Sequence, residues 1–198
     1  MTKYVVNSGN VRADKEKAKK FVAEVVANLG RTPKILFCTF AVLRQHWEKK
    51  FEDYSGDLAN YLSETVVPEY KMALPELFVE QCVWADVVWV LGGDDYLLMF
   101  WLKQFELTKL WDGKTVATSS ASSDAVSAYF WTCDWRKCID GLGLISIKFL
   151  PHFGSSYGND DPRGTIDWVA AKTELAEYGD ESLTIYALPE GDFAVFEI

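Results

Sequence analysis

The sequence predicts an α/β fold of three layers, in which a mostly parallel sheet carries helices on both of its faces. Short runs of Val, Ile and Leu recur without alternating polar residues, as in "YVV", "ILF" and "VVWVL". Such runs are typical of strands buried on both faces of a parallel sheet. Segments with apolar residues at helical spacing lie between these runs, and this alternation is typical of the α/β class.

The first half of the chain is expected to contain three strands and two helices. Phe21 and Val25 lie on one face of the helix expected at residues 12–30, and Gly30 is expected to end it as a C-terminal cap. The segment at residues 43–62 is charged on one side, as a surface helix is. The expected elements are, in order, a strand at 3–9, a helix at 12–30, a strand at 33–42, a helix at 43–62 and a strand at 65–70.

The second half continues the alternation and ends on two strands. Pro, Glu, Gly and Asp at residues 189–192 predict that the last two strands form a hairpin. The expected elements are, in order, a strand at 85–93, a helix at 94–111, a strand at 113–120, a helix at 121–131, a strand within 141–153, a helix at 165–178 and strands at 182–191 and 192–198. No repeat or linker interrupts them, so we expect one domain over residues 1–198.

Composition narrows the class of protein. The net charge of −9 argues against nucleic acid or an anionic membrane surface as a partner. No apolar run approaches the ~20 residues of a membrane span, and the polar start does not resemble a signal peptide, so we expect a cytoplasmic protein. Because no signal peptide is expected, the four cysteines are expected to be reduced thiols. Cys133 and Cys138 have no neighbouring His, so their spacing is only a weak metal motif.

Four loops are expected to meet at the carboxyl ends of the parallel strands, where ligands bind in such folds. Their sequences are "NSGN" (7–10), "LGGDD" (91–95), "TSSASSD" (118–124) and "LPHF" (150–153).

The chain has two histidines, and they differ in setting. His46 lies in a charged helix and is expected to be a surface or half-buried residue. His152 follows an apolar strand and is held by Pro151, which favours a role as a base. A serine hydroxyl needs such a base to become a nucleophile.

Ser120 is the candidate nucleophile, because the residues around it are all small and a strained strand-to-helix elbow needs small neighbours. The alternative is that Ser119, Ser122 or Ser123 only caps the following helix. The carboxylate that would orient the histidine has three candidates, Asp134, Asp140 and Glu190. The pair Gly92 and Gly93 fits a phosphate cradle or an oxyanion hole, and the adjacent Asp94 and Asp95 disfavour phosphate.

Taken in order, these motifs resemble the peptidase E (aspartyl dipeptidase) family of serine peptidases, which is related to cyanophycinase. The matching segments are "NSGN", "ILFCTFA", "ADVVWVLGGDD", "TVATSSASSD", "TCD", "LPHF" and "ALPEGDFAV". The resemblance implies a fold like class I glutamine amidotransferases, which is flavodoxin-like. It also implies these roles: Ser120 is the nucleophile, His152 is its base, Glu190 is the carboxylate that orients His152, and Asp134 is a nearby acid. Gly92, Gly93 and Ala121 would form the oxyanion hole.

The chain departs from the family pattern in four places. Thr118 and Ser122 stand where the family elbow has Gly, and Asp94 and Asp124 stand where it has Asn. Ser122 would be strained if the elbow requires a positive φ there. An added carboxylate would oppose the negative charge of an oxyanion.

The preference for an aspartyl substrate lacks a visible basis. An acidic side chain requires an Arg or Lys partner, and residues 115–130 contain neither. Arg136 and Arg163 are the nearest candidates.

The leading hypothesis is a serine hydrolase that cleaves amide bonds of small peptides without a metal or organic cofactor. The alternative is a catalytically impaired scaffold that binds a small molecule or a protein. A nucleotide-binding flavodoxin-like domain ranks last, because no Gly-rich loop has the right pattern.

Four tryptophans expected in or beside helices belong either to the core or to a homodimer surface. They are Trp101, Trp111, Trp131 and Trp135.

Overall fold

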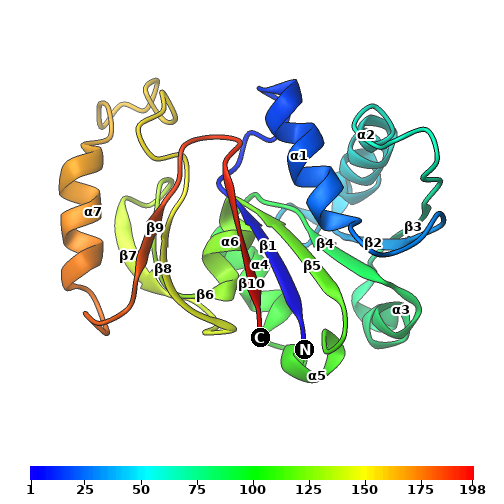
Figure 1. The fold of residues 1–198 in the computed structure, drawn as a ribbon. Coiled ribbons are helices and arrows are strands. Elements are labelled where there is room, and N and C mark those ends of the chain that lie inside the picture. The colour runs from blue at the N-terminus through cyan, green and yellow to red at the C-terminus, as the bar shows by residue number, and fades with distance from the viewer.

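The computed structural model describes all 198 residues and contains two β-sheets side by side (Figure 1). The larger sheet has six strands in the order β10-β1-β5-β4-β2-β3. They are β1 (Lys3–Asn7), β2 (Lys34–Cys38), β3 (Glu69–Met72), β4 (Val87–Val90), β5 (Thr115–Ser119) and β10 (Phe193–Glu197). Only β10 runs antiparallel to its neighbour, β1.

The smaller sheet has four strands in the order β7-β6-β8-β9. They are β6 (Ser127–Thr132), β7 (Lys137–Asp140), β8 (Ile145–Leu150) and β9 (Ile185–Ala187). The pairs β6–β8 and β8–β9 are parallel, and β6–β7 is antiparallel.

Seven α-helices and two short 3-10 helices connect the strands. The α-helices are α1 (Lys15–Val25), α2 (Trp47–Leu58), α3 (Phe78–Trp84), α4 (Asp95–Leu102), α5 (Leu107–Leu110), α6 (Ala121–Val126) and α7 (Trp168–Glu177). The 3-10 helices are η1 (Arg44–His46) and η2 (Pro75–Leu77). In Figure 1, α7 stands outside the smaller sheet, and α4 and α6 lie behind β1 and β10.

Successive residues of the central strands pack on opposite faces of the larger sheet. Leu36 and Val88 belong to a cluster of 25 buried residues to which α3, α4, α5 and α6 contribute. Phe37 and Trp89 belong to a cluster of 11 buried residues beneath α1 and α2. Helices therefore cover both faces, and the predicted three-layer, mostly parallel α/β class is confirmed.

The hairpin predicted at residues 189–192 is wrong. β9 pairs with β8 in the smaller sheet, whereas β10 pairs with β1 in the larger sheet. A turn motif reports only local geometry, and each of these strands found its partner at a sheet edge formed by distant residues. The turn therefore joins the two sheets.

Several predicted elements have different bounds. The helix predicted at 121–131 ends at Val126, and the aromatic residues after it form β6, in keeping with the strand preference of aromatic side chains. The helix predicted at 94–111 is broken into α4 and α5. α1 ends at Val25, so Gly30 lies beyond the helix and does not cap it. The strand predicted at 65–70 begins later, at Glu69.

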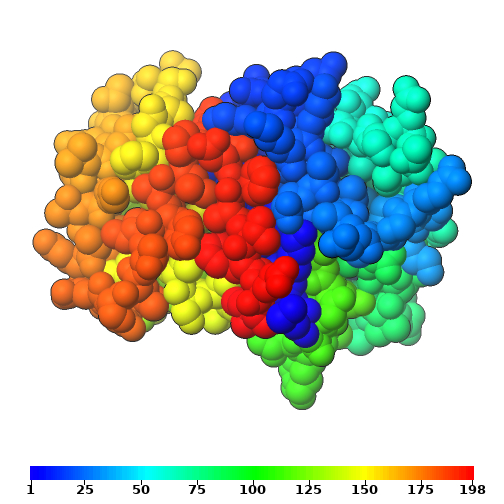
Figure 2. All heavy atoms as spheres, viewed as in Figure 1, coloured from blue at the N-terminus to red at the C-terminus, as the bar shows by residue number.

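The two chain ends lie together. The main-chain N–H of Thr2 donates to Ile198 O at 2.6 Å, and the N–H of Ile198 donates to Thr2 O at 3.0 Å. Figure 2 shows the C-terminal residues in red across the middle of this face, with the first residues of the chain in blue beside them. No helix is both long and apolar enough to cross a membrane.

The cysteines and tryptophans occupy mostly interior positions. All four cysteines are free thiols, and only Cys138 is partly exposed. Trp111 and Trp131 are buried, and Trp131 belongs to β6 rather than to a helix. Trp135 is half exposed.

Candidate active site

Ser120 lies at a sharp elbow between β5 and α6. Its φ of 57° and ψ of −123° are unusual for a residue with a side chain, and such strain gathers at functional sites. It occupies the N-cap position of α6 but makes no side-chain capping hydrogen bond. Its hydroxyl is therefore available for another partner.

The extra hydroxyls of this segment hold the elbow in place. Ser122 Oγ accepts the N–H of Ser119 and donates to Val90 O, both at 2.7 Å. Ser123 Oγ donates to Asn7 O at 2.7 Å and lies 2.8 Å from Thr118 Oγ1. These bonds tie the elbow to β4 and β1. Ser122 is helical, so the strain considered for it falls on Ser120 instead.

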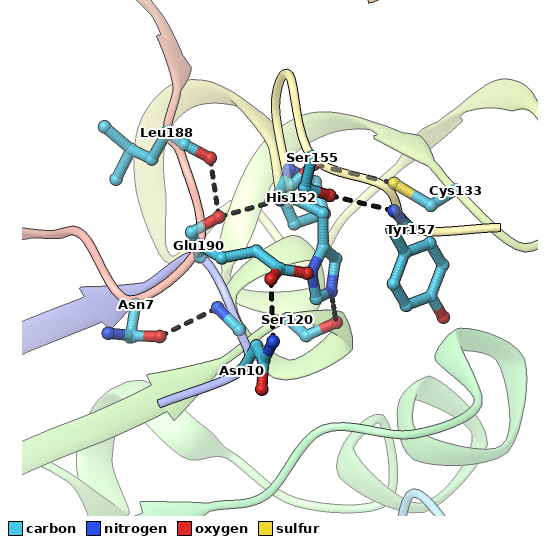
Figure 3. Close-up of polar contacts among 12 residues, drawn as sticks. Asn7, Asn10, Ser120, Cys133, His152, Ser155, Tyr157, Leu188 and Glu190 are labelled. Atoms are coloured by element: carbon cyan, nitrogen blue, oxygen red, sulfur yellow. Dashed lines mark hydrogen bonds and ion pairs between the residues drawn. The ribbon is translucent and has the colours of Figure 1, made fainter. Parts of the chain in front are cut away.

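His152 lies in the turn after β8, and its imidazole lies between Ser120 and Glu190 (Figure 3). The distance from His152 Nε2 to Ser120 Oγ is 2.9 Å, and the distance from Nδ1 to Glu190 Oε1 is also 2.9 Å. The main-chain N–H of His152 donates to Ser8 Oγ at 2.7 Å, and Ser8 Oγ donates to Leu188 O at 2.6 Å. The backbone around His152 is thus attached to both sheets.

Glu190 reaches His152 because the turn that carries it crosses between the sheets. Asn10 Nδ2 donates to Glu190 Oε2 at 2.7 Å, and Lys17 Nζ donates to Glu190 O at 3.1 Å. Burial alone would raise the pKa of Glu190, but the hydrogen bonds from Asn10 and His152 outweigh it, and the pKa lies below its usual value. Glu190 is therefore a carboxylate at neutral pH.

Burial lowers the pKa of His152 below its usual value, and the hydrogen bond to Glu190 only partly offsets this effect. The imidazole is therefore neutral at pH 7. With its proton on Nδ1 facing Glu190, Nε2 is free to accept the proton of Ser120. This is the arrangement that a general base requires.

Two glycines allow the backbone to approach these side chains. A Cβ atom on Gly9, which has a φ of 111°, would overlap His152 Cε1 and lie 2.7 Å from Nε2. A Cβ atom on Gly92 would overlap Ser119 O and lie 3.2 Å from Ser120 Cβ. Any other residue at these positions would displace the histidine or the elbow.

Two backbone N–H groups beside Ser120 have no hydrogen-bond acceptor in the protein. The N–H of Gly93 donates to no group of the protein, and the N–H of Ala121 is the first of α6 and has no acceptor within that helix. Lys50 Nζ donates to Gly92 O. The C=O and N–H of a trans peptide point in opposite directions, so Lys50 also sets the direction of the Gly93 N–H. Burial lowers the pKa of Lys50 to about 8.

Of the three candidate carboxylates, only Glu190 contacts His152. Asp134 accepts the hydroxyl of Tyr157 at 2.7 Å, and the Tyr157 ring stacks on the His152 ring with centroids 4.1 Å apart. Asp134 thus approaches the imidazole through Tyr157 rather than directly. Asp140 belongs to β7 and makes no hydrogen bond to the site.

The two acids that depart from the family pattern have different surroundings. Asp94 caps α4, and its Oδ1 accepts the N–H of Leu97 at 2.7 Å. Asp124 is buried in α6, and burial raises its pKa well above the usual value. Asp94 is therefore held by the helix terminus, and burial favours the neutral form of Asp124, which weakens its opposition to an oxyanion.

The arginines considered as partners for an acidic substrate are already paired. Arg163 forms an ion pair with Asp161 at 2.5 Å and donates to Asp134 O at 2.7 Å. Arg136 donates to Gly164 O and lies 3.9 Å from Asp161. The structure therefore supplies no free cation for an aspartyl side chain from these two residues.

Sequence reasoning missed several residues of this site. Asn10 and Ser8 belong to the "NSGN" loop that was expected near the site, but their contacts with Glu190 and His152 were not predicted. Lys50 and Tyr157 carried no recognisable signal, because a lysine in a charged helix and a tyrosine in a Gly-rich loop are common. His46 is exposed, as expected. No group of three metal-binding side chains is present.

No protein-family model and no curated protein matches the chain. In structure, the chain is similar to a protein from Listeria monocytogenes EGD-e named provisionally as a peptidase E, with a TM-score of 0.65, 15% identity, and coverage of 100% of this chain and 99% of that chain. It is also similar to a peptidase from an acI-B1 actinobacterium, with a TM-score of 0.65, 22% identity, and coverage of 99% and 83%. The chain therefore has a peptidase E-like fold, as the sequence motifs implied.

Proposed function

We propose that the protein is a serine hydrolase that cleaves amide bonds of small peptides. The observation that carries this proposal is the continuous hydrogen-bonded chain from Ser120 Oγ through His152 to Glu190, with 2.9 Å at each step. The strained conformation of Ser120 and the unpaired N–H of Gly93 support it. The names of the two structural neighbours, both peptidases, agree with it.

In the first step, Ser120 Oγ forms a bond to the amide carbonyl carbon. The hydroxyl proton moves to His152 Nε2, and Glu190 stabilises the imidazolium that results. The carbonyl oxygen becomes an oxyanion, which accepts the N–H groups of Gly93 and Ala121.

In the second step, the carbon–nitrogen bond breaks and His152 returns the proton to the leaving amine. A water molecule then attacks the acyl-enzyme ester and gives its proton to His152, and the carboxylic acid leaves as Ser120 regains its proton. Every proton in this sequence is held by Ser120, His152, water or the substrate, so the proposal includes no metal or organic cofactor. Asp134 is proposed to act only through Tyr157.

Intact-mass measurement after exposure to a fluorophosphonate tests the proposal. In that reaction a bond forms between Ser120 Oγ and phosphorus, fluoride leaves, and the serine proton passes to His152. We expect one adduct on the parent protein, none on Ser120→Ala and almost none on His152→Ala. Ser146→Ala is the matched control, because this serine is exposed on β8 and its loss should leave the adduct unchanged.

No adduct on folded parent protein would contradict the hydrolase. That outcome would favour the alternative, in which the scaffold binds a small molecule or a protein without catalysis. An adduct that persists in Ser120→Ala would place the reactive serine elsewhere.

A further inference from the structure

The strand β3 is the outermost strand at one edge of the larger sheet, at the right of Figure 1. The main-chain N–H groups of Val67, Glu69 and Ala73 donate to the neighbouring segment that contains β2, at 2.7, 3.0 and 2.8 Å. Alternate residues of a strand direct their main-chain groups to the same side, so those of Tyr70 and Met72 face away from β2. No second strand lies beside β3 to pair with them.

Four main-chain groups on this edge have no partner within the protein. They are the N–H and the C=O of Tyr70, the N–H of Met72 and the C=O of Pro68. The C=O of Met72 is already bonded, because Gln81 Nε2 donates to it at 2.9 Å. Pro68 has no N–H to donate. The edge therefore presents two donors and two acceptors, in an order that Pro68 and Gln81 determine.

The charged side chains of β3 also lack an ionic partner. Glu69 and Lys71 are exposed and lie on the same face of the sheet, because they are two residues apart. Neither forms an ion pair within the chain. Lys71 Nζ lies 4.2 Å from the centroid of the Trp84 ring, which holds the ammonium beside the edge. An acid and a base are thus placed on one face of an unpaired strand.

We propose that β3 pairs with β3 of a second copy of this chain, antiparallel about a two-fold axis at Tyr70. In this register Tyr70 lies opposite its own copy, and each Tyr70 N–H donates to the C=O of the other. The Met72 N–H of each copy donates to the Pro68 C=O of the other. Every unpaired main-chain group of the edge then has a partner, and the two six-stranded sheets become continuous.

The same register pairs the charges. Glu69 of each copy lies directly opposite Lys71 of the other, in the closer, non-hydrogen-bonded type of pair with Cβ atoms about 5 Å apart. A shift of one strand by two residues places either Glu69 opposite Glu69 or Lys71 opposite Lys71. Like charges directly opposite each other are destabilising, so the charges select one register. Each copy contributes the same residues, as a two-fold interface requires.

The edge fits its own copy better than it fits other strands. Charged residues and proline on an edge strand discourage pairing with unrelated strands. Lys71 requires an acid opposite it, and Pro68 leaves the facing C=O without a donor. In a second copy Glu69 supplies the acid, and the C=O that faces Pro68 belongs to Met72, which Gln81 already satisfies. The two features that exclude other strands therefore admit a second copy.

Pairing at β3 leaves the candidate active site open. Two strands, β4 and β2, separate β3 from β5, and Ser120 directly follows β5. The inference is therefore independent of the proposed hydrolase, and its test does not use catalysis.

Sedimentation velocity at pH 7 in about 0.15 M salt, over about 5–500 μM protein, tests the inference. An edge of this length buries less than the roughly 1,200 Å² of a stable interface, so we expect reversible dimers with a dissociation constant on the order of 50 μM. Glu69→Lys and Lys71→Glu each place like charges opposite one another and should weaken the dimer about tenfold or more. Lys20→Glu is the matched control for Lys71→Glu, because Lys20 is exposed on α1 and the net charge changes equally.

Two further samples test the register itself. The double variant Glu69→Lys/Lys71→Glu exchanges the charges and keeps the net charge, so its dissociation constant should return to within about threefold of the parent value. An equimolar mixture of the two single variants should form mixed dimers, because both facing pairs are then of opposite charge. Hydrogen exchange of the peptide that contains residues 68–72 should slow about threefold or more at the highest protein concentration, as Tyr70 and Met72 gain acceptors.

A parent protein that remains monomeric at the highest concentration would overturn the inference. Single variants that dimerise as well as the parent, or a double variant as weak as the single ones, would overturn it too, because the charges would not face each other. Dimers in which the peptide at residues 68–72 exchanges at an unchanged rate would place the interface on another surface.

Discussion

The two sides of Ser120 differ in how completely their polar groups are paired. On the side of His152, each functional atom has a partner within the protein: Nε2 meets Ser120, Nδ1 meets Glu190, and Glu190 is held in turn by Asn10. On the side of α4 and α6, the buried carboxyls of Asp95 and Asp124 have no basic partner: Thr132 donates to Asp95, and the two carboxyls otherwise have only each other.

This difference separates a network aligned for proton transfer from a pair of buried acids. Groups that transfer protons must already be aligned when the substrate arrives, and the pairing around His152 achieves that alignment. The active site is therefore preorganised for proton transfer on the side of His152, whereas its other side holds two buried carboxyls without a basic partner.

Replacement of Glu190 should have the largest effect on the reactivity of Ser120, because it removes the partner of His152 Nδ1. Glu190→Gln removes the charge that stabilises the imidazolium and disturbs the tautomer of His152, so we expect the rate of fluorophosphonate labelling to fall about 10³-fold or more. Asp134→Asn is the comparison, because Asp134 acts through Tyr157 and should change the rate by about tenfold or less. Equal losses in the two variants would show that the assignment of Glu190 as the orienting carboxylate is wrong.

Replacement of Lys50 should have a smaller effect on the labelling rate, because Lys50 contacts the proposed oxyanion hole only through Gly92 O. Because the pKa of Lys50 is lowered to about 8, its ammonium is charged below pH 8 and loses that charge as the pH rises. We expect the labelling rate to increase from acid pH as His152 becomes neutral, with a midpoint below 6.5, and to fall again near pH 8.

Lys50→Met should lower the plateau about tenfold and abolish the alkaline fall. Lys49→Met is the matched control, because Lys49 is exposed and pairs with Asp53. Two results would show that Lys50 does not act on the proposed oxyanion hole. One is a labelling rate that stays constant above pH 8 in the parent protein, and the other is an alkaline fall that persists in Lys50→Met.

Replacement of Asp124 should change the stability of the protein by an amount that depends on pH. A carboxyl with a raised pKa in the folded state contributes stability that is present below its unfolded pKa of 3.8 and is lost as the pH rises through the folded value. Asparagine resembles the protonated form at every pH. Asp124→Asn should therefore raise the free energy of unfolding by about 1 kcal/mol at pH 8, with little change at pH 3.5.

Urea unfolding at the two pH values measures this difference, and Asp94→Asn should show less than about 0.5 kcal/mol at either. A destabilised Asp124→Asn protein at pH 8 would mean that the ionised carboxyl has a stabilising partner, and that burial does not raise its pKa.

Much of the fold could be predicted because its signals are local. The run "VVWV" indicated a strand buried on both faces, and "TVATSSASSD" indicated a strand, an elbow and a helix start. The aromatic residues of β6 misled the prediction, since Ala128 and Tyr129 continue the apolar pattern of α6 after the helix has ended. The turn at 189–192 misled it for another reason, because its two strands join different sheets.

By itself, the sequence determined the alternation of buried strands and helices, and hence which loops gather at the carboxyl ends of the strands. It also indicated Ser120 and His152 as the candidate nucleophile and base, with helix capping as the alternative role for the neighbouring serines. These properties depend on spacing and on residues within a few positions of one another.

Only the tertiary structure decided which partners meet. Glu190 is 38 residues from His152, Asn10 is 180 residues from Glu190, and Lys50 is 42 residues from Gly92. Such contacts follow from how the two sheets pack, and no local pattern records them. The pairing of the buried carboxyls of Asp95 and Asp124 is decided in the same way, since these residues lie 29 positions apart and meet only because α4 and α6 pack together.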